Sequence, residues 1–333
     1  MARLDDKLAR IAAGQDRPTD FIIADAKDGD MGFGATAPGP RRDAAGKPTD
    51  SFKTLADYVD QIRAIIAQDK VDIMLTSVST YELLKTAGAY DGTLITPAVR
   101  LNDTSDIWGN RTGRYRETAS IPFRSARLSE VRRLGVELGL YSMTFNNDAE
   151  ADVRTLEYFR RFREDIAEHG LDWFLEVFNP NVNEPSDPRE TGAFVNDWLV
   201  RSLAGLSQRE RPRFLKIAYN GARSMEELCA YDPRLIVGIL GGSAGTTHDA
   251  LLLLHEAARH GAKIALFGRK INLAESPLDL ITQMRAVVEG STRPAEAVKA
   301  YHDALAKQGI APARDIEADL AVTDPVLRAD GAG

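Results

Sequence analysis

The chain has 333 residues, and its formal net charge at neutral pH is −7. This acidic balance argues against a nucleic-acid-binding surface, which needs clustered Lys and Arg. Charged residues make up 27% of the chain, as in ordinary globular proteins, so general disorder is not expected. The single cysteine, Cys229, excludes an intramolecular disulfide and suits a reducing compartment.

The first residues of the chain, 1–15, are charged and resemble a helix, without the apolar core of a signal peptide. The sequence also contains no run of about 18 apolar residues, the length that a transmembrane helix requires. We therefore expect a soluble, cytoplasmic protein without membrane contact.

Short apolar runs alternate with helical patterns along the whole chain. Eight of these runs predict β-strands: 21–25, 71–75, 93–99, 140–145, 171–178, 213–218, 234–240 and 262–267. The patterns with helical spacing are 54–68, 128–139, 152–170, 246–261, 276–290 and 293–308. Gly139, Gly170 and Gly261 are predicted to end three of these helices, and Thr246 or Thr247 is predicted to cap the start of one.

The predicted strands lack polar alternation, as expected of parallel strands that are buried on both faces. Strand–helix alternation predicts right-handed βαβ units, and eight units in about 250 residues fit a closed (β/α)8 TIM barrel of the α/β class. Helices alone follow the eighth strand. We expect an N-terminal helix in residues 1–19, the barrel in 20–310, and a polar, loosely held tail in 311–333.

Two long segments, 29–50 and 101–127, follow the first and third predicted strands. Both leave the carboxyl ends of strands, where barrel enzymes place their active sites. The second segment is rich in arginine: Arg111, Arg114, Arg116, Arg124 and Arg127. Such side chains bind oxyanions in a bidentate way, but they also suit a solvated loop or one that packs on a neighbouring subunit. Both interpretations stay open here.

Lys216 is a charged residue inside an apolar strand. Lysine is rarely buried without a reason, and a desolvated amine can form a Schiff base with a carbonyl substrate. The alternative is a lysine whose amine reaches water from the end of the strand. Glu176 lies in the same way in the preceding strand, so it could orient Lys216 or transfer protons, or the two residues could form a structural ion pair. Asp25 and Lys27 at the end of the first strand are further candidates, although Asp25 could equally be a turn residue.

A glycine-rich segment, Gly241-Gly242-Ser243, joins the seventh strand to a helix start, and Gly268-Arg269 follows the eighth strand. The loops after the seventh and eighth strands commonly hold phosphate in barrels, where backbone N–H groups and a helix N-terminus attract an anion. These glycines could also serve turn geometry alone. Arg100, at the end of the third strand, is a further candidate for substrate binding.

The same residues allow a rival interpretation, in which segment 237–269 is a strand–loop–helix–strand unit that binds NADP in an oxidoreductase. The glycines do not fit the G-x-G-x-x-G pattern, and only helices follow. A third possibility is a barrel that binds a sugar phosphate without catalysis. The five histidines all fall in predicted helices or at their ends, so they form no cluster of the kind a catalytic zinc site needs. We expect neither a metal nor an organic cofactor.

Taken together, these segments resemble the class I, Schiff-base aldolases of the barrel type. The pattern is most similar to the tagatose-bisphosphate aldolase group, with archaeal-type fructose-bisphosphate and deoxyribose-phosphate aldolases as relatives. The resemblance rests on Ala24-Asp25-Ala26-Lys27, Phe174-Leu175-Glu176, Leu215-Lys216-Ile217, Gly241-Gly242-Ser243 and Gly268-Arg269.

The resemblance implies a carbon–carbon lyase in which Lys216 forms the iminium, while Glu176 and Asp25 transfer protons. Gly241, Gly242, Ser243, Gly268 and Arg269 would hold the anionic group. The fourth strand lacks the basic residue of the family pattern, so Tyr141 is the expected hydroxyl donor there. We expect a phosphorylated or otherwise anionic ketose as the substrate, and a homo-oligomer as the functional form.

Overall fold

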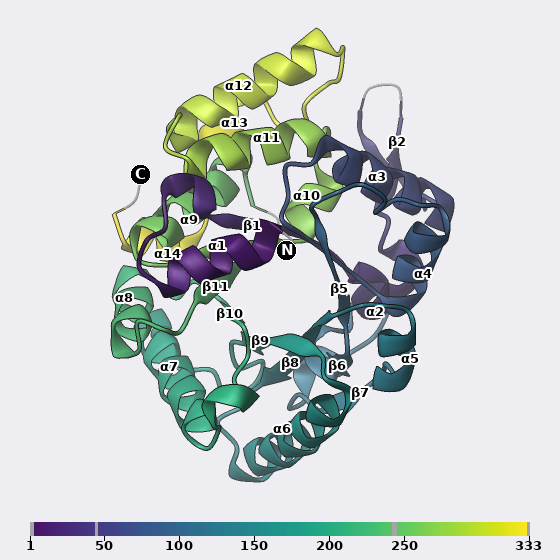
Figure 1. Ribbon diagram of the computed structural model, residues 1–333. Helices are drawn as coiled ribbons and strands as arrows, with labels where there is room; N and C mark the ends of the chain where they lie inside the picture. The colour runs from purple at the N-terminus through teal and green to yellow at the C-terminus, as the bar shows by residue number, and fades with distance from the viewer. Residues whose placement is uncertain (1–2, 44–45, 242–244, 332–333) are drawn as a thin grey trace.

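A closed barrel of eight parallel strands forms the centre of the computed structural model, which describes residues 3–43, 46–241 and 245–331 (Figure 1). In chain order the barrel strands are β1 (Ile22–Lys27), β4 (Ile73–Thr76), β5 (Thr96–Arg100), β8 (Leu138–Thr144), β9 (Asp172–Phe178), β10 (Leu215–Ile217), β11 (Val237–Leu240) and β12 (Ile264–Phe267). Strand β1 pairs with both β4 and β12, which closes the barrel. Each predicted strand overlaps one of these eight, and the predicted (β/α)8 class is confirmed.

The closed sheet also decides the rival nucleotide-binding interpretation. Strand β11 pairs with β10 on one side and with β12 on the other, so both strands of this segment belong to the closed barrel. A dinucleotide fold needs an open sheet with a crevice where the strand order reverses. That interpretation of the segment is therefore wrong.

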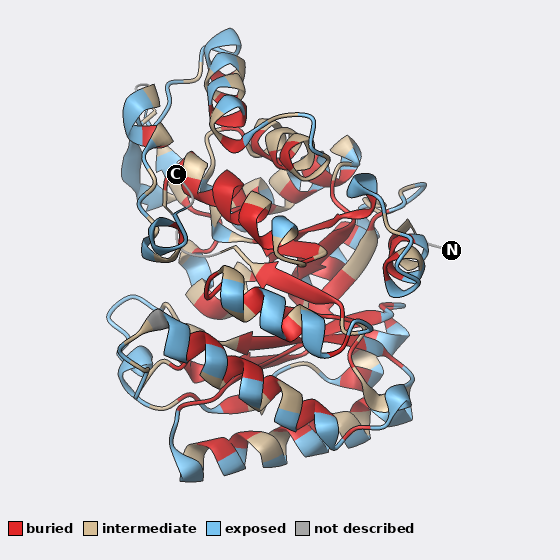
Figure 2. Cartoon of the chain, turned by 90° about the vertical axis from the view of Figure 1, so that its left-hand side faces the viewer, coloured by how far each residue is buried: buried red, intermediate tan, exposed pale blue. Residues whose placement is uncertain are grey.

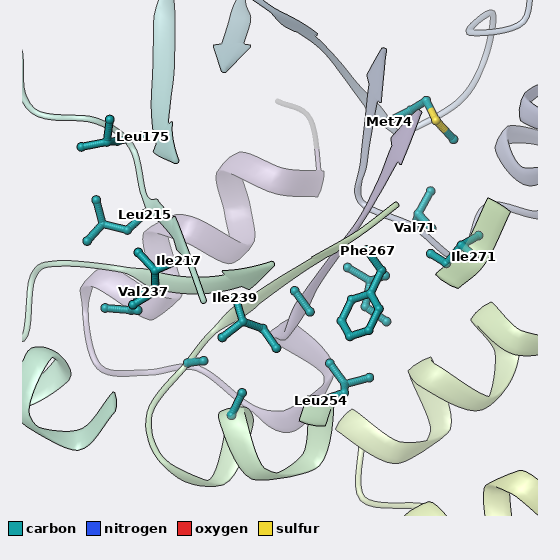
Figure 3. Packing of buried hydrophobic residues seen from close by; sticks show 14 of the residues in the cluster. Val71, Met74, Leu175, Leu215, Ile217, Val237, Ile239, Leu254, Phe267 and Ile271 are labelled. Carbon is teal, nitrogen blue, oxygen red and sulfur yellow. The ribbon is translucent and has the colours of Figure 1, made fainter. Parts of the chain in front are cut away.

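Side chains along each barrel strand point alternately into the barrel and toward the surrounding helices. The inner set is apolar at its base, where Phe174 and Phe214 stack with ring centroids 4.5 Å apart. The outer set includes Ile239 and Phe267, which pack with Leu254 on a neighbouring helix (Figure 3). Both faces of each strand are thus buried, which explains why the sequence shows apolar runs without alternation.

Helices surround the barrel with their buried sides toward the strands and their exposed sides outward (Figure 2). The main ones are α3 (Leu55–Gln68), α4 (Val78–Thr86), α5 (Leu128–Arg133), α6 (Ala149–His169), α7 (Pro188–Ala204), α8 (Ala222–Tyr231), α9 (Thr247–Arg259), α11 (Pro277–Val288) and α12 (Pro294–Lys307). Thr246 caps α9 by accepting a hydrogen bond from the Asp249 N–H, as predicted, and Gly170 ends α6 in the left-handed region. Within the described residues, none of the helices has the length and apolar character needed to cross a membrane.

The helix predicted over 128–139 is shorter in the structure. Helix α5 stops at Arg133, Gly135 takes a positive φ of 80°, and strand β8 begins at Leu138. Gly139 is therefore a strand residue and not a helix stop. A Cβ at this position would lie 2.2 Å from Leu101 Cδ1, so glycine here makes room for Leu101.

The two long segments after β1 and β5 contain structure of their own. The first holds the short helix α2 (Gly29–Phe33) and an antiparallel hairpin, β2 (Pro40–Arg42) with β3 (Pro48–Phe52). The second holds the hairpin β6 (Asn102–Thr104) with β7 (Pro122–Arg124), joined by the 3₁₀ turns η3 (Ser105–Ile107) and η4 (Tyr115–Glu117). Residues of both segments, such as Phe33 and Ile107, line the cavity at the carboxyl end of the barrel.

The C-terminal tail, expected to be loosely held, forms two further short helices. These are α13 (Ile316–Leu320) and α14 (Pro325–Ala329), and both pack against α9. Leu327 is fully buried, and Asp319 accepts a hydrogen bond from the Thr247 N–H at 2.7 Å. The tail therefore covers the first turn of α9, and the expectation of a loose segment is wrong.

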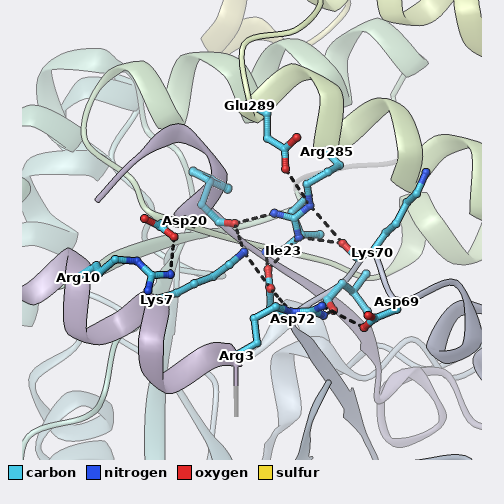
Figure 4. A network of polar contacts seen from close by, with 12 residues as sticks. Arg3, Lys7, Arg10, Asp20, Ile23, Asp69, Lys70, Asp72, Arg285 and Glu289 are labelled. Carbon is cyan, nitrogen blue, oxygen red and sulfur yellow. Dashed lines mark hydrogen bonds and ion pairs between the residues drawn. The ribbon is translucent and has the colours of Figure 1, made fainter. Parts of the chain in front are cut away.

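The N-terminal helix α1 (Arg3–Ala12) lies across the amino end of the barrel, where Leu4 and Leu8 join the inner apolar cluster. Asp72, fully buried just before β4, anchors it (Figure 4). The Asp72 carboxylate lies 2.9 Å from Arg3 Nε, 2.9 Å from Lys7 Nζ and 2.8 Å from Arg285 Nη2. Burial alone would raise the pKa of Asp72, but the charges of Arg285 and Lys7 hold that pKa below its ordinary value.

Candidate active site

The barrel opens at its carboxyl end into a cavity of about 450 Å³. This volume lies within the range of small-molecule sites, about 300–1,000 Å³. The wall comes from strand ends, from the long segments after β1 and β5, and from the loops after β11 and β12. Active sites of barrel enzymes are built at this end of the fold.

Lys216 and Glu176 lie side by side on this cavity wall. They occupy paired positions on the neighbouring strands β10 and β9, and both side chains face the cavity. Lys216 Nζ is 2.6 Å from Glu176 Oε1, and the two residues are only 5% and 1% exposed. The structure thus brings together the two residues on which the sequence interpretation depends.

Two further residues extend this pair around the barrel. Ser142, opposite Glu176 on β8, donates a hydrogen bond from Oγ to Glu176 Oε2 at 2.6 Å. Arg100 at the end of β5 donates to Ser142 Oγ at 2.7 Å and to Glu176 Oε2 at 3.1 Å. Glu176 therefore has a fixed orientation, because Arg100 and Ser142 hold one carboxylate oxygen while Lys216 contacts the other.

Asp28 completes a charge-balanced set in the deep part of the cavity. Arg100 Nε donates to Asp28 Oδ2 at 2.5 Å, so Arg100 joins two carboxylates. Although burial would raise it, the pKa of Asp28 is lowered overall, because Arg100 and Lys216 stabilise the carboxylate. Asp28, Arg100, Glu176 and Lys216 together carry no net charge. The sequence patterns indicate no role for Asp28 or Ser142, and for Arg100 they indicate only substrate binding.

The structure does not bring Asp25 and Lys27 into this set. On β1, Ala26 lines the cavity and Asp25 and Lys27 point to the opposite face, where Lys27 Nζ lies 3.4 Å from Asp25 Oδ1. Lys27 Nζ also donates to Asn272 Oδ1 at 3.4 Å. Burial raises the pKa of Asp25 to about 6, against the opposing effect of Lys27. Asp28, and not Asp25, therefore shares the inner face with Ala26 and lines the cavity.

Tyr141 also lies outside the cavity. Its ring is 1% exposed and stacks on Phe162 of α6, with centroids 4.1 Å apart. Side chains alternate along β8, so a strand that points Tyr141 at the helices points Ser142 into the barrel. The hydroxyl that β8 places against Glu176 is that of Ser142.

Three of the residues predicted to hold an anion lie on the cavity wall. Gly241, Gly268 and Arg269 line the cavity, while Gly242 and Ser243 lie outside the described residues. A Cβ on Gly268 would lie 2.9 Å from the Ala26 carbonyl oxygen, so close packing with β1 also requires glycine there. The pKa of Arg269 is lowered by partial desolvation and by the like charge of Arg116.

At the N-terminus of α9, next to the predicted anion site, two backbone amides already have partners within the chain. The Thr246 N–H donates to Asp249 Oδ2 at 2.9 Å, and the Thr247 N–H donates to Asp319 Oδ1 at 2.7 Å. Carboxylates of the chain itself thus occupy these first amides.

The arginines of segment 101–127 divide into different environments. Arg114 pairs with Glu117, Arg124 pairs with Asp165, and Arg111 lies over the Phe52 ring, 5.8 Å from its centroid. Arg116 alone among the five lines the cavity. Within the described ranges, no group of three His, Cys, Asp or Glu side chains is arranged to hold a metal ion.

Comparisons with known proteins agree with this architecture. No protein-family model matches the chain. An uncharacterized aldolase of Saccharolobus solfataricus is 24% identical over 200 residues, which are 59% of this chain and 70% of the relative. The similarity to barrel aldolases expected from short motifs is thus found over a longer alignment.

Solved structures show the same fold. An archaeal fructose 1,6-bisphosphate aldolase has a TM-score of 0.61 and 16% identity, over 86% of this chain and 99% of its own. Another structure of such an aldolase, with its catalytic lysine covalently bound to a carbinolamine intermediate, has a TM-score of 0.61 and 17% identity, over 86% of this chain and 100% of its own. A protein of Corynebacterium glutamicum has a TM-score of 0.60 and 15% identity, over 87% of this chain and 98% of its own.

Proposed function

We propose that this protein is a class I aldolase that forms or cleaves a carbon–carbon bond through a Schiff base on Lys216. The observation that carries the proposal is the buried Lys216 amine, which faces the cavity and lies 2.6 Å from Glu176 Oε1. Proton transfer along this contact would leave a neutral amine, the form that attacks a carbonyl carbon. Similarity to a protein described as an aldolase supports the same chemistry.

The first step joins the amine to the substrate. Lys216 Nζ attacks the ketone carbon, and the carbonyl oxygen takes a proton from the attacking nitrogen to give a carbinolamine. Glu176, carrying the proton from the amine, then protonates the carbinolamine hydroxyl, which leaves as water and yields the iminium. Ser142 and Arg100 keep Glu176 in position for both transfers, because their contacts fix its other oxygen.

The second step breaks the carbon–carbon bond. The iminium accepts the bonding electrons and becomes an enamine, while the neighbouring carbon becomes an aldehyde as its hydroxyl loses a proton. Asp28 is the base for this proton, since it lines the cavity and is held ionised by Arg100 and Lys216. Protonation of the enamine carbon and hydrolysis of the iminium then release the ketone product.

The substrate class follows from the charges of the outer cavity. Arg269 lines this part together with the loop glycines Gly241 and Gly268, whose backbones can approach a ligand closely. An arginine there favours a phosphate or carboxylate, which it binds in a bidentate way. We therefore propose a phosphorylated or otherwise anionic ketose as the substrate.

Trapping with sodium borohydride tests the chemistry. The protein is incubated with dihydroxyacetone phosphate or another candidate ketone, the iminium is reduced, and the modified peptide is identified by mass spectrometry. We expect the adduct on Lys216, its loss in Lys216→Met, and its retention in Lys27→Met, a matched buried lysine on the opposite face of the barrel wall.

Two outcomes would overturn the proposal. One is the absence of any Lys216 adduct with a ketone that the enzyme turns over. The other is a Lys216→Met variant that keeps full activity. Retained ligand binding without turnover in the unmodified protein would instead point to a non-catalytic barrel.

The same proposal includes a cytoplasmic homo-oligomer. The lone Cys229 forms no disulfide, which suits a reducing compartment. Tyr115 and Ile121 on the segment after β5 are apolar and exposed, which supports contact with a second copy. Sedimentation equilibrium checks this, because a single species at the chain mass of 36.5 kDa would contradict it.

A further inference from the structure

The deep and outer parts of the cavity differ in charge. In the deep part, Asp28 and Glu176 neutralise Arg100 and Lys216 through direct contacts. This set therefore attracts neither cations nor anions strongly. Any preference for a charged substrate must come from the outer part.

The outer part contains two guanidinium groups, those of Arg116 and Arg269. They are close enough for the charge of Arg116 to contribute to the lowered pKa of Arg269. The third carboxylate of the cavity wall, Asp106, accepts hydrogen bonds from the Ser120 and Thr144 hydroxyls at 2.8 Å and 2.7 Å. Among the ion pairs of the described residues, none involves Arg116. Arg116 therefore places on the cavity wall a positive charge that no ion pair among the described residues neutralises.

The backbone that carries Arg116 is fixed on the cavity rim. Asn181, in the loop after β9, donates from Nδ2 to the Arg116 carbonyl at 3.1 Å and to the Thr118 carbonyl at 2.6 Å. The Ser120 N–H donates back to Asn181 Oδ1 at 3.2 Å, while the Ser120 hydroxyl is held by Asp106. These contacts use backbone atoms of Arg116 and leave its guanidinium available to a ligand. A pre-positioned arginine spends less free energy on ordering when an anion binds.

We propose that Arg116 determines substrate specificity by binding an anionic group at the end of the substrate remote from the carbonyl carbon that Lys216 attacks. This inference rests on the proposed aldolase function and adds a second anion-binding position, distinct from the loop glycines. The group is a terminal phosphate or a terminal carboxylate, because both present oxygens that match a guanidinium. The ligand class is therefore a ketose with a negative charge at its far end.

Matched ketoses separate the two anions. Fructose 1,6-bisphosphate differs from fructose 1-phosphate only by the remote phosphate, and fructuronate differs from fructose only by the remote carboxylate. For each compound, the amount of borohydride-trapped Lys216 adduct is measured against concentration, which gives a half-saturation value without requiring turnover. A charge-assisted arginine contact predicts a preference of roughly 10- to 100-fold within at least one pair. The pair that shows the preference identifies the anion.

Two variants in the segment after β5 test whether Arg116 causes the preference for the charged ketose. Arg116→Gln is expected to abolish it while leaving the half-saturation value of the uncharged-end partner unchanged. Arg114→Gln is the control, because Arg114 is an exposed neighbour that pairs with Glu117, and it should leave both values as they are. Asn181 holds Arg116 only through its backbone carbonyl, so Arg116→Gln should fold as the unmodified protein does.

The outcomes distinguish this inference from the proposed function. A Lys216 adduct without preference in either pair, or a preference that survives in Arg116→Gln, overturns the role of Arg116 alone. Absence of a Lys216 adduct with all four ketoses and with dihydroxyacetone phosphate overturns the aldolase proposal and this inference with it.

Discussion

Ser142 Oγ lies 2.6 Å from one carboxylate oxygen of Glu176, and the Lys216 amine lies 2.6 Å from the other. This arrangement links three neighbouring strands through one carboxylate, because Ser142, Glu176 and Lys216 occupy paired positions on β8, β9 and β10. Glu176 thus contacts the Ser142 hydroxyl, the Lys216 amine and the Arg100 guanidinium at the same time.

Replacing Glu176 tests this central position. In Glu176→Gln the side chain can neither accept the amine proton nor return it to the carbinolamine, so adduct formation on Lys216 should slow by roughly 10²- to 10⁴-fold. The measurement is the rate of borohydride-trapped adduct, with circular dichroism as the check on folding. Glu130→Gln, an exposed pair with Arg133, is the control. An unchanged rate in a folded Glu176→Gln variant would remove Glu176 from the mechanism.

Asp28 and Asp25 offer a direct comparison of two neighbouring carboxylates. Asp28→Asn should lower kcat about 100-fold or more, because it removes the base proposed to take the hydroxyl proton. Asp25→Asn should change kcat only a few-fold, since Asp25 faces away from the cavity. Steady-state kinetics on both variants shows which substitution lowers kcat more. A larger loss of kcat in Asp25→Asn would contradict the proposed role of Asp28.

The raised pKa of Asp25 predicts that the stability of the protein depends on pH. Burial raises its pKa to about 6 in the folded protein, above the ordinary value near 3.8. The folded state therefore holds this proton more tightly, so the stabilising contribution is complete below the ordinary pKa and is lost as pH rises through about 6. Urea unfolding of the wild type and Asp25→Asn between pH 5 and 8 should give a wild-type free energy of unfolding that declines relative to the variant. A constant difference would show that Asp25 does not titrate in this range.

The comparison of Asp25 with Asp28 also shows how far the sequence predicts this site. Lys216 and Glu176 were recognisable because a charged residue in an apolar strand is conspicuous. The sequence does not show whether a given side chain points into the barrel or toward the helices. Barrel strands are apolar on both faces, so they lack the polar alternation that would distinguish inward from outward positions. Residues an odd number of positions apart on a strand point to opposite faces. Tyr141 was therefore expected where Ser142 lies, and Asp25 where Asp28 lies.

Other features depend on contacts between distant segments. The Asp319 carboxylate that occupies the first turn of α9 comes from a short helix about 70 residues later, whose polar sequence resembled a loose tail. Gly139 resembled a helix stop, but it is a strand glycine that accommodates Leu101. Local sequence patterns predict the helices and strands and their order. Contacts between distant segments, such as those of Asp319 and Gly139, form only in the closed barrel.

The Asp72 cluster at the amino end predicts an effect on stability without an effect on chemistry. Asp72→Asn leaves Arg3, Lys7 and Arg285 without their shared buried carboxylate, which should cost about 3–5 kcal/mol. Because its folded pKa is lowered, the contribution of Asp72 is present above its ordinary pKa and is lost as pH falls through the folded value.

Chemical denaturation at neutral pH measures this cost, and Asp69→Asn serves as the comparison. Asp69 pairs with the same Arg3 but its side chain is 47% exposed, so its loss should cost below about 1 kcal/mol. Trapped adduct per folded molecule should be unchanged in both variants. Equal destabilisation by the two substitutions would show that burial of Asp72 adds nothing.

Asn102 is predicted to be a positioning residue for Glu176. It is fully buried at the start of β6, where its Oδ1 accepts from the Ser142 N–H at 2.6 Å and its Nδ2 donates to the Ser142 carbonyl at 2.7 Å. The side-chain amide thus replaces a strand partner for Ser142 and fixes the hydroxyl that holds Glu176. Asn102→Ala should lower kcat roughly 10-fold with little change in KM, and should shift the limb of the pH–rate profile that reports the essential acid.

The same substitution leaves two buried backbone groups unpaired, which costs about 1–3 kcal/mol each, so stability must be separated from catalysis. Asn196→Ala is the matched control, because Asn196 is a buried amide that joins α7 to the Ser224 carbonyl of α8, away from the cavity. It should lose stability with an unchanged pH–rate profile. Asn102→Asp keeps the acceptor and loses the donor, so it should recover part of kcat. If Asn102→Ala loses activity only in proportion to its unfolded fraction, Asn102 supports the fold and does not position Glu176.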